Sequence, residues 1–250
     1  MARRYDTKTT MFTPEGRLQQ VEYAIEAINH STSSIGILTK EGILLAAKKK
    51  RVAKLVDRTK DADKMYEIDI NIACAACGIT ADINTLIEYL RKRCQQYRFT
   101  YNEDMPVETL VQNICELKQS YTQRGGMRPY GVSFLYAGYD KYSGYQLYTS
   151  DPSGNYAGWK ATAIGANNQA AESILKTDYQ DDMTLDDAKK LVVKIFSKSV
   201  ESSSMIPSKL EFGVFRLNDQ KKPTFKLMKD AEVAALLREC GIEINENGKD

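Results

Sequence analysis

Ile43-Leu44-Leu45-Ala46-Ala47 is apolar at every position, and this stretch decides the fold class. A strand with such a pattern is buried on both faces, as in the middle layers of a sandwich. It follows the run 34–39 across Lys40-Glu41-Gly42, and two strands joined by a short loop that contains glycine form a hairpin. We therefore predict a hairpin whose second strand lies between two packed layers.

Strand and helix patterns come in blocks on both sides of this hairpin. Ahead of it, apolar residues recur at helical spacing from Leu18 to Ile28, after the turn-forming cluster 13–16. Helices in pairs between blocks of strands do not follow the strict alternation of a parallel sheet. The order predicts an α+β fold, a four-layer αββα sandwich of two antiparallel sheets with helices on both outer faces. Behind the hairpin, the expected elements are strands 64–68 and 71–77, a helix capped by Thr80, a helix that begins near Pro106, strands 132–139, 144–150 and 156–164, helices 167–177 and 184–200, strands 210–217 and 224–228, and a helix 231–240.

Length and composition indicate one domain with a sizeable core. Hydrophobic residues make up 42% of the 250 residues, and no linker or shift in composition divides the chain. We expect a single domain over residues 1–240, with an N-terminal arm over 1–12 and a short polar tail over 241–250. The five cysteines are an odd number scattered along the chain, which favours a reducing, intracellular compartment.

The charge pattern argues against nucleic acid and membrane as partners. The formal net charge is only +2, whereas a phosphate-binding domain shows a clear basic excess. No apolar stretch approaches the roughly 20 residues of a membrane helix. The basic run 48–51 could be a nuclear-import patch or an anion site, but it directly follows an apolar strand, which favours a solvated strand end.

No residue pattern points to catalysis, a metal or a cofactor. Cys74 and Cys77 stand three apart in a strand and point to opposite faces, so they suit neither a disulfide nor a zinc site. His30, the only histidine, ends an amphipathic helix and is expected to interact with the helix dipole. The carboxylate pairs at 181–182 and 186–187 are predicted to be solvated or to cap a helix that begins with Thr184-x-x-Asp187.

Residues 5–24, YDTKTTMFTPEGRLQQVEYA, closely resemble the N-terminal signature of proteasome alpha subunits. Further matches to that family are GGMRPYGVS at 125–133, DPSG at 151–154 and KATAIG at 160–165. The resemblance covers roughly residues 3 to 237. It implies the N-terminal-nucleophile hydrolase fold, which is an αββα sandwich like the one read from the element order.

The resemblance also implies that the chain is not an enzyme. Beta-type members of the family cut peptides with an N-terminal threonine, whose free α-amine acts as the base for its own hydroxyl. Thr32 stands at the nucleophile's place, but it lies inside the chain, so its nitrogen is an amide. Ser31 precedes it where a processing site would have glycine, and Lys48 replaces the acidic partner. Lys64 falls near the catalytic lysine, and one member of a broken set gives no catalysis.

The role implied instead is ring assembly and control of access. The expected partners are other alpha and beta subunits, stacked as heptameric rings in the cytoplasm and nucleus. The residues expected at the gate of the axial pore are Tyr5, Asp6, Pro14 and Tyr23. Thr7 departs from the family pattern, since archaeal relatives have an arginine there.

Lys64 matches the lysine that lines a pocket between adjacent alpha subunits. The resemblance implies that activator C-terminal tails insert their carboxylates there, and an ammonium is a natural counter-charge. From the residues alone, Lys64 would be an exposed lysine at the start of a strand. Two other functions stay open: an active threonine hydrolase released by removal of residues 1–31, and a stand-alone binding module.

Overall fold

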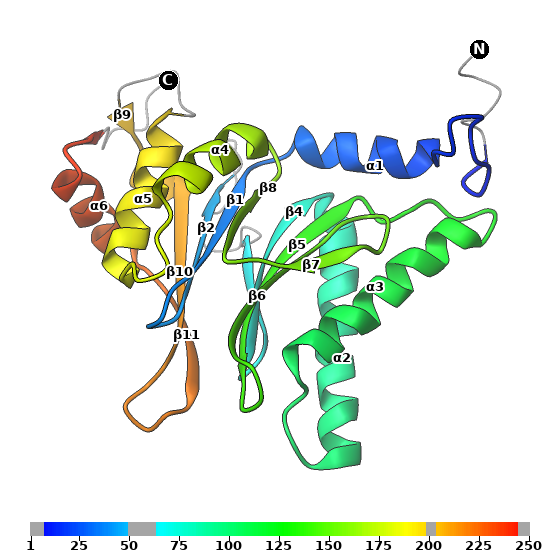
Figure 1. Cartoon of the computed structure of the whole chain (residues 1–250), viewed down its shortest axis with the longest axis horizontal. Helices are drawn as coiled ribbons and strands as arrows, with labels where there is room; N and C mark the ends of the chain where they lie inside the picture. Colours follow the sequence, from blue (N-terminus) through cyan, green and yellow to red (C-terminus); the bar gives the residue numbers. More distant parts are fainter. Residues whose placement is uncertain (1–7, 50–63, 199–203, 245–250) are drawn as a thin grey trace, which may run out of the picture.

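The computed structural model describes residues 8–49, 64–198 and 204–244 of the chain. Two five-stranded antiparallel sheets pack face to face, and helices cover both outer faces (Figure 1). This arrangement confirms the predicted four-layer αββα sandwich. Within the described ranges, no helix combines the length and the apolar character that a bilayer crossing requires.

The first sheet has the strand order β11-β10-β2-β1-β8, with β2 at its centre. Along β2, Leu44 and Ala46 face the helices, whereas Ile43, Leu45 and Ala47 face the second sheet. All five side chains are fully buried, which confirms the prediction from their uniform apolarity. The strands of this sheet are β1 (Ser34–Leu38), β2 (Ile43–Lys48), β8 (Ala161–Ile164), β10 (Leu210–Leu217) and β11 (Pro223–Leu227).

The second sheet has the order β3-β4-β5-β6-β7, so its neighbours in space are also neighbours in sequence. Its inner face packs on the first sheet through Ala73, Ala75, Leu135 and Ala137. Its strands are β3 (Met65–Asp69), β4 (Ile72–Gly78), β5 (Val132–Asp140), β6 (Gly144–Ser150) and β7 (Tyr156–Gly158).

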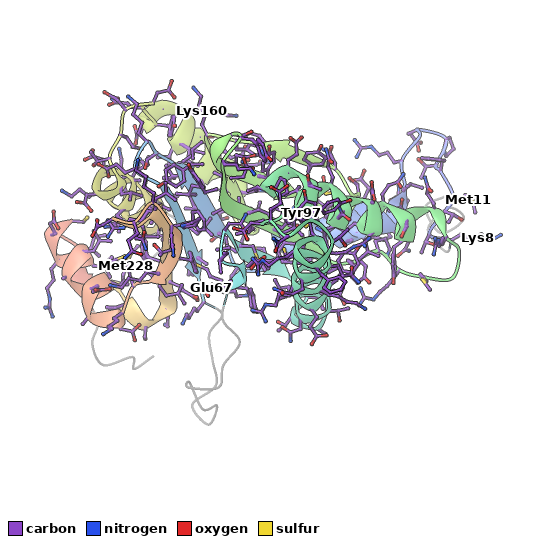
Figure 2. All side chains as sticks on the ribbon, turned by 90° about the horizontal axis from the view of Figure 1, so that it is seen from below. Lys8, Met11, Glu67, Tyr97, Lys160 and Met228 are labelled. Atoms are coloured by element: carbon purple, nitrogen blue, oxygen red, sulfur yellow. The ribbon has the colours of Figure 1, made fainter. Side chains whose placement is uncertain are left out.

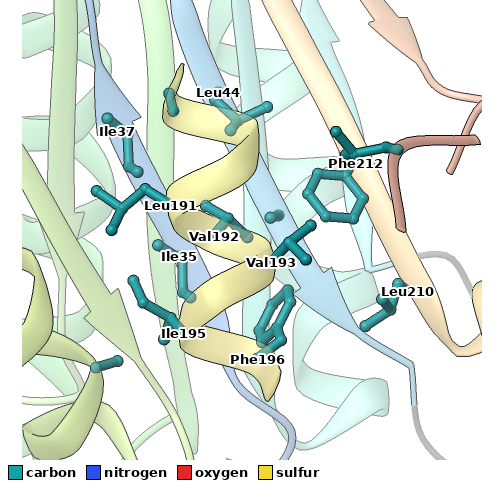
Figure 3. Close-up of a cluster of buried hydrophobic side chains, with 14 of the residues drawn as sticks. Ile35, Ile37, Leu44, Leu191, Val192, Val193, Ile195, Phe196, Leu210 and Phe212 are labelled. Atoms are coloured by element: carbon teal, nitrogen blue, oxygen red, sulfur yellow. The ribbon is translucent and has the colours of Figure 1, made fainter. Parts of the chain in front are cut away.

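Five helices cover the two outer faces. α2 (Thr80–Tyr101) and α3 (Val107–Gln123) lie on the second sheet, and α4 (Asn168–Asp178), α5 (Leu185–Lys198) and α6 (Asp230–Glu239) lie on the first. Figure 3 shows α5 laid against β1, β2 and β10, with Phe196 close to Phe212. The centroids of these two rings are 6.4 Å apart at 80°, an edge-to-face contact that aromatic pairs favour.

α1 (Gln19–Asn29) stands apart from these layers and runs across one end of the sandwich, against β4 and β5 (Figure 1). Its buried face carries Val21 and Ile28, as the helical spacing predicts. The chain then passes from α1 into β1 through only four residues, 30–33. The end of the sandwich next to the start of β1 is therefore covered by a helix of the same chain.

Two details of the expected elements are wrong. The single strand predicted over 156–164 is two strands, β7 in one sheet and β8 in the other, because the chain crosses between the sheets at Trp159 and Lys160. Thr80 is not the N-cap of α2 but its first helical residue, since the extended Ile79 precedes it.

Short elements complete the C-terminal part of the described chain. A 3₁₀ turn at Pro207–Lys209 leads into β10. β12 (Glu243–Ile244) pairs in parallel with β9 (Ser204–Met205), and β12 lies within the segment expected as a polar tail.

Candidate functional site

Thr32 lies where α1 gives way to β1, and its surroundings are closely packed. The Cys77 thiol is 3.0 Å from the Thr32 carbonyl oxygen and donates to it. Gly165, with φ +85°, approaches the same oxygen so closely that a Cβ there would lie 2.2 Å from it. The Thr32 hydroxyl oxygen is buried and has no hydrogen-bond partner among the described residues. Thr32 is half-buried as a residue, but its carbonyl and its hydroxyl both pack against the fold.

Lys48 and Lys64 approach this place from the two sheets. The Lys48 amide donates to the Ser33 carbonyl at 2.9 Å, which places Lys48 beside the start of β1. Lys64 directly precedes β3, and its positive charge interacts electrostatically with the Cys77 thiol. Burial raises the pKa of the Cys77 thiol to about 11, while the hydrogen bond with Ser34 and the Lys64 charge oppose that rise. The thiol is therefore protonated at neutral pH and is a poor nucleophile.

Glu211 holds the start of β3 from the opposite sheet. Its side chain is 5% exposed, and Oε2 accepts a hydrogen bond from the Lys64 backbone amide at 3.3 Å. The same oxygen lies 3.6 Å from Nζ of Lys49. Glu211 is absent from the predicted site residues, because a lone glutamate in an otherwise apolar strand has no distinguishing pattern until its partner on another strand is known.

The geometry around Thr32 does not suit an amine-activated nucleophile. A peptide nitrogen has no basic lone pair, and here Thr32 follows Ser31 at the end of a helix that lies across this end of the sandwich. Removing residues 1–31 would also remove α1 and uncover the surface that Val21 and Ile28 now cover. The threonine is thus built into the chain rather than presented to a substrate.

A cavity of about 300 Å³ lies on the other side of β1, between α4 and α5. Its lining includes the apolar residues Ile35, Ile174 and Phe196 and the polar residues Ser33, Asn167 and Lys198. Among the described residues that line it, there is no carboxylate, imidazole or thiol. Its polar lining therefore offers a lysine and a serine but no group typical of a metal site.

The predicted gate residues within the described ranges lie at the start of α1. Pro14 is exposed in a tight turn, in which the Gly16 amide donates to the Thr13 carbonyl at 2.8 Å. The Thr13 amide donates to the Arg17 carbonyl at 2.8 Å, and its hydroxyl accepts from the Arg17 amide at 3.2 Å. The turn expected at 13–16 is therefore confirmed.

Tyr23 lies on α1 and is 47% exposed. Phe12, which bridges to Leu18 at the base of the turn, is 63% exposed. Figure 2 places Lys8 and Met11 at one end of the long axis and Met228 towards the other. Tyr5, Asp6 and Thr7 lie outside the described residues.

The other sequence motifs have structural roles. Cys74 packs among the residues under α2 and α3, whereas Cys77 faces Thr32, so the two thiols do lie on opposite faces. All five cysteines are free. Within the described ranges, no three metal-ligating side chains come together.

The polar sequence motifs lie at helix ends or on the surface. His30 follows α1, with Nε2 3.1 Å from a Glu26 carboxylate oxygen. Thr184 and Asp187 cap α5 reciprocally, as predicted, through bonds from each backbone amide to the other side chain. Asp181 pairs with Lys160 in solvent.

Lys118 is a buried cation that the sequence pattern did not predict. It lies on α3, is 0% exposed, and donates to the Val132 carbonyl and to the Ser150 hydroxyl, both at 2.9 Å. Its Nζ also lies 5.1 Å from the centre of the Phe134 ring. Burial lowers the pKa of Lys118 to about 8. Although a serine–lysine pair can act as a nucleophile and base, both side chains are enclosed, so the contact holds α3 against β5 and β6.

Comparison with known proteins assigns the family. Residues 28–215 match the family model described as "Proteasome subunit", and residues 5–27 match the model for the N-terminal signature of A-type proteasome subunits. The chain is 54% identical over 242 residues to the alpha type-4 proteasome subunit of Spinacia oleracea, and 52% identical over 242 residues to the alpha type-4-A protein of Arabidopsis thaliana. Each alignment covers 97% of both proteins.

A Schizosaccharomyces pombe protein, named as a probable alpha type-3 proteasome subunit, is 50% identical over 238 residues, which is 95% of this chain. Within the family, the stretches RRYD at 3–6 and SDPSGNYAGWK at 150–160 look most like the alpha type-4 subunit. Both plant relatives carry that name, which agrees with this likeness. The position of Thr32 inside the chain, the helix over the start of β1 and the matched alpha-type signature agree with one another. The chain therefore belongs to the proteasome subunit family, as an alpha-type, non-catalytic member.

Proposed function

We propose that this alpha subunit helps to form the outer ring of the proteasome core particle, to gate its substrate channel and to dock the C-terminal tails of activators. In this role it would serve ubiquitin-dependent and ubiquitin-independent protein degradation, in the cytoplasm and nucleus. Its partners would be neighbouring alpha and beta subunits in heptameric rings. It would need no cofactor.

The observation that carries the gating role is the turn ahead of α1. The three hydrogen bonds between residues 13, 16 and 17 fix the direction in which the chain leaves the body of the subunit. Proline at the second position of the turn restricts φ and supports the same geometry. Pro14 and Tyr23 are both exposed, so they are available to the N-terminal segment or to a neighbouring subunit. Tyr5 and Asp6 are proposed to complete this cluster.

The tail-docking role rests on Lys64 and its setting. The residue is partly buried at the start of β3, and within the described ranges no carboxylate pairs with its ammonium. A partly desolvated ammonium is a suitable partner for a peptide's terminal carboxylate, because the charged hydrogen bond is stronger away from bulk water.

Replacing Lys64 with alanine tests the docking role. In assembled core particles, Lys64→Ala should weaken stimulation of peptide hydrolysis by an activator-tail peptide, while ring assembly and basal hydrolysis stay unchanged. Lys40→Ala is the matched control, since Lys40 is an exposed lysine in the β1–β2 loop. Because other pockets can mask a single loss, the tail peptide should carry a photoreactive group and its cross-links to this chain should be counted by mass spectrometry. Equal cross-linking of the Lys64→Ala and native chains would contradict the docking role.

Native mass measurement tests the ring role. The chain should be found in a very large complex and not as a free binding module. Its intact mass should include the residues ahead of Thr32, whereas an active threonine hydrolase would begin at that residue.

A further inference from the structure

A buried carboxylate connects the two sheets beside Lys64. Glu211 lies on β10 of the first sheet, while Lys64 leads into β3 of the second, so their hydrogen bond crosses the layer between the sheets. Glu211 is 5% exposed, between the fully buried Phe212 and the buried Leu210. A charge in such surroundings is costly unless hydrogen bonds or opposite charges compensate for the lost water.

Two of the groups that offset the buried charge of Glu211 affect Lys64 in different ways. The bond from the Lys64 amide, 3.3 Å, fixes the backbone from which the lysine side chain extends. The Lys49 ammonium, 3.6 Å away, balances the negative charge of the same carboxylate oxygen. Since the carboxylate binds the Lys64 backbone and is balanced by Lys49, the Lys64 ammonium is left for another anion.

We propose that Glu211 is a positioning residue for Lys64, and this inference rests on the docking function proposed for that lysine. The Glu211 carboxylate holds Lys64, the residue directly before β3, against β10, so the Lys64 ammonium meets a tail carboxylate at a fixed place. Preorganisation of this kind raises affinity because less freedom is lost on binding. Lys49 keeps the carboxylate engaged and reduces its competition for the Lys64 ammonium.

The test uses assembled core particles and a synthetic activator-tail peptide with a photoreactive group, with the C-terminally amidated peptide as the blank. Glu211→Met removes the acceptor and the charge at similar volume, and Glu211→Gln keeps an acceptor without the charge. Glu67→Ala is the matched control, because this glutamate is an exposed residue of β3. Each variant is measured for cross-linking to this chain and for hydrogen exchange at the Lys64 amide.

Glu211→Met should raise the peptide concentration for half-maximal cross-linking about tenfold, which is the usual effect of losing a hydrogen bond to a charged group. Exchange at the Lys64 amide should become faster in the same variant. Glu211→Gln should keep most of the amide protection and most of the binding, and Glu67→Ala should change neither. If Glu211→Gln keeps the peptide binding, the loss in Glu211→Met comes from the missing hydrogen bond to the Lys64 backbone and not from the missing charge.

The outcomes separate this inference from the docking function. If Lys64→Ala lowers cross-linking and Glu211→Met does not, Glu211 has no positioning role and the docking function stands. If Lys64→Ala has no effect either, the docking function is wrong and the inference with it. Should Glu211→Met fail to assemble, exchange in the unmodified particle decides: an unprotected Lys64 amide would overturn the inference.

Discussion

Replacement of Lys118 by methionine should change how the stability of this chain depends on pH. The Lys118 ammonium is completely buried, its hydrogen-bond acceptors are neutral oxygens, and burial lowers its pKa from 10.5 to about 8. One pKa unit corresponds to about 1.4 kcal/mol, so the charged form is penalised by about 3 kcal/mol relative to the unfolded chain. Cys115, Asp151 and Cys74 also interact electrostatically with Lys118, and all three remain in the variant.

The sign of the effect follows from the protons bound in each state. Between pH 8 and about 10.5 the folded chain has released the Lys118 proton, and the unfolded chain still holds it. The free energy of unfolding that depends on Lys118 therefore rises with pH across this window and is constant below it. The free energy of unfolding of the native chain, minus that of the Lys118→Met variant, should increase by about 2 to 3 kcal/mol between pH 7 and pH 10.

Urea unfolding of the two purified chains at both pH values measures this difference, provided that unfolding is two-state. Lys92→Met is the control, because Lys92 is exposed on α2 and its replacement should leave the pH dependence unchanged. Comparing the change in the free energy of unfolding between the two pH values removes the contribution of the thiols and tyrosines that both chains share. A difference between native chain and Lys118→Met that is the same at pH 7 and pH 10 would refute the account of Lys118 as a penalised internal cation.

Two further variants test a close backbone contact and a partly buried ion pair. Gly165→Ala should lower the free energy of unfolding by about 3 kcal/mol or more, or prevent folding, because its Cβ would meet the Thr32 carbonyl in a left-handed backbone conformation. Thermal unfolding beside Gly125→Ala, which meets no atom within 4 Å, checks this, and equal losses would contradict it. Arg128→Met should cost about 1 kcal/mol at pH 7, since it removes two hydrogen bonds, 2.6 and 2.7 Å, to the buried Asp82. Arg128 lowers the pKa of Asp82, so this cost should shrink as acid protonates the carboxyl; a cost that is constant down to about pH 2 would be the contrary result.

The architecture was predictable where a residue's local pattern determines its environment. A strand that is apolar at every position, like Ile43–Ala47, is expected to be buried on both faces, so the strand and its place between two packed layers follow from the sequence. The strand predicted over 156–164 fails for the opposite reason. Both halves are extended, and the crossing is visible only in partners: the Trp159 amide donates to Leu147 of one sheet, while Lys160 accepts from the Leu38 amide of the other.

Lys118 shows a second limit of prediction from the sequence. In α3, Leu110, Ile114, Leu117 and Tyr121 recur at helical spacing and suggest an apolar face. The buried face instead turns from Ile114 through Cys115 to Lys118 and Thr122. The spacing of Val111, Cys115, Lys118 and Thr122 contains this signal. The spacing alone does not indicate burial at this position, because lysine is rarely fully buried.

The candidate site was predictable only from the family likeness. Thr32 and Lys64 carry no local pattern of their own. Cys77 indicates that they lie near one another, because its thiol donates to the Thr32 carbonyl and interacts electrostatically with Lys64. Glu211 could not be chosen from the sequence, since the contact that defines its role joins residues on different sheets.

The central claim is that Thr32 cannot act as a nucleophile because its nitrogen is part of a peptide bond. Treatment of core particles with an epoxyketone-type inhibitor, followed by intact mass measurement of each subunit, tests it most directly. We predict covalent adducts on catalytic beta subunits, and no added mass on this chain with the residues ahead of Thr32 still attached. A chain that begins at Thr32 and carries the inhibitor on that residue would contradict the account.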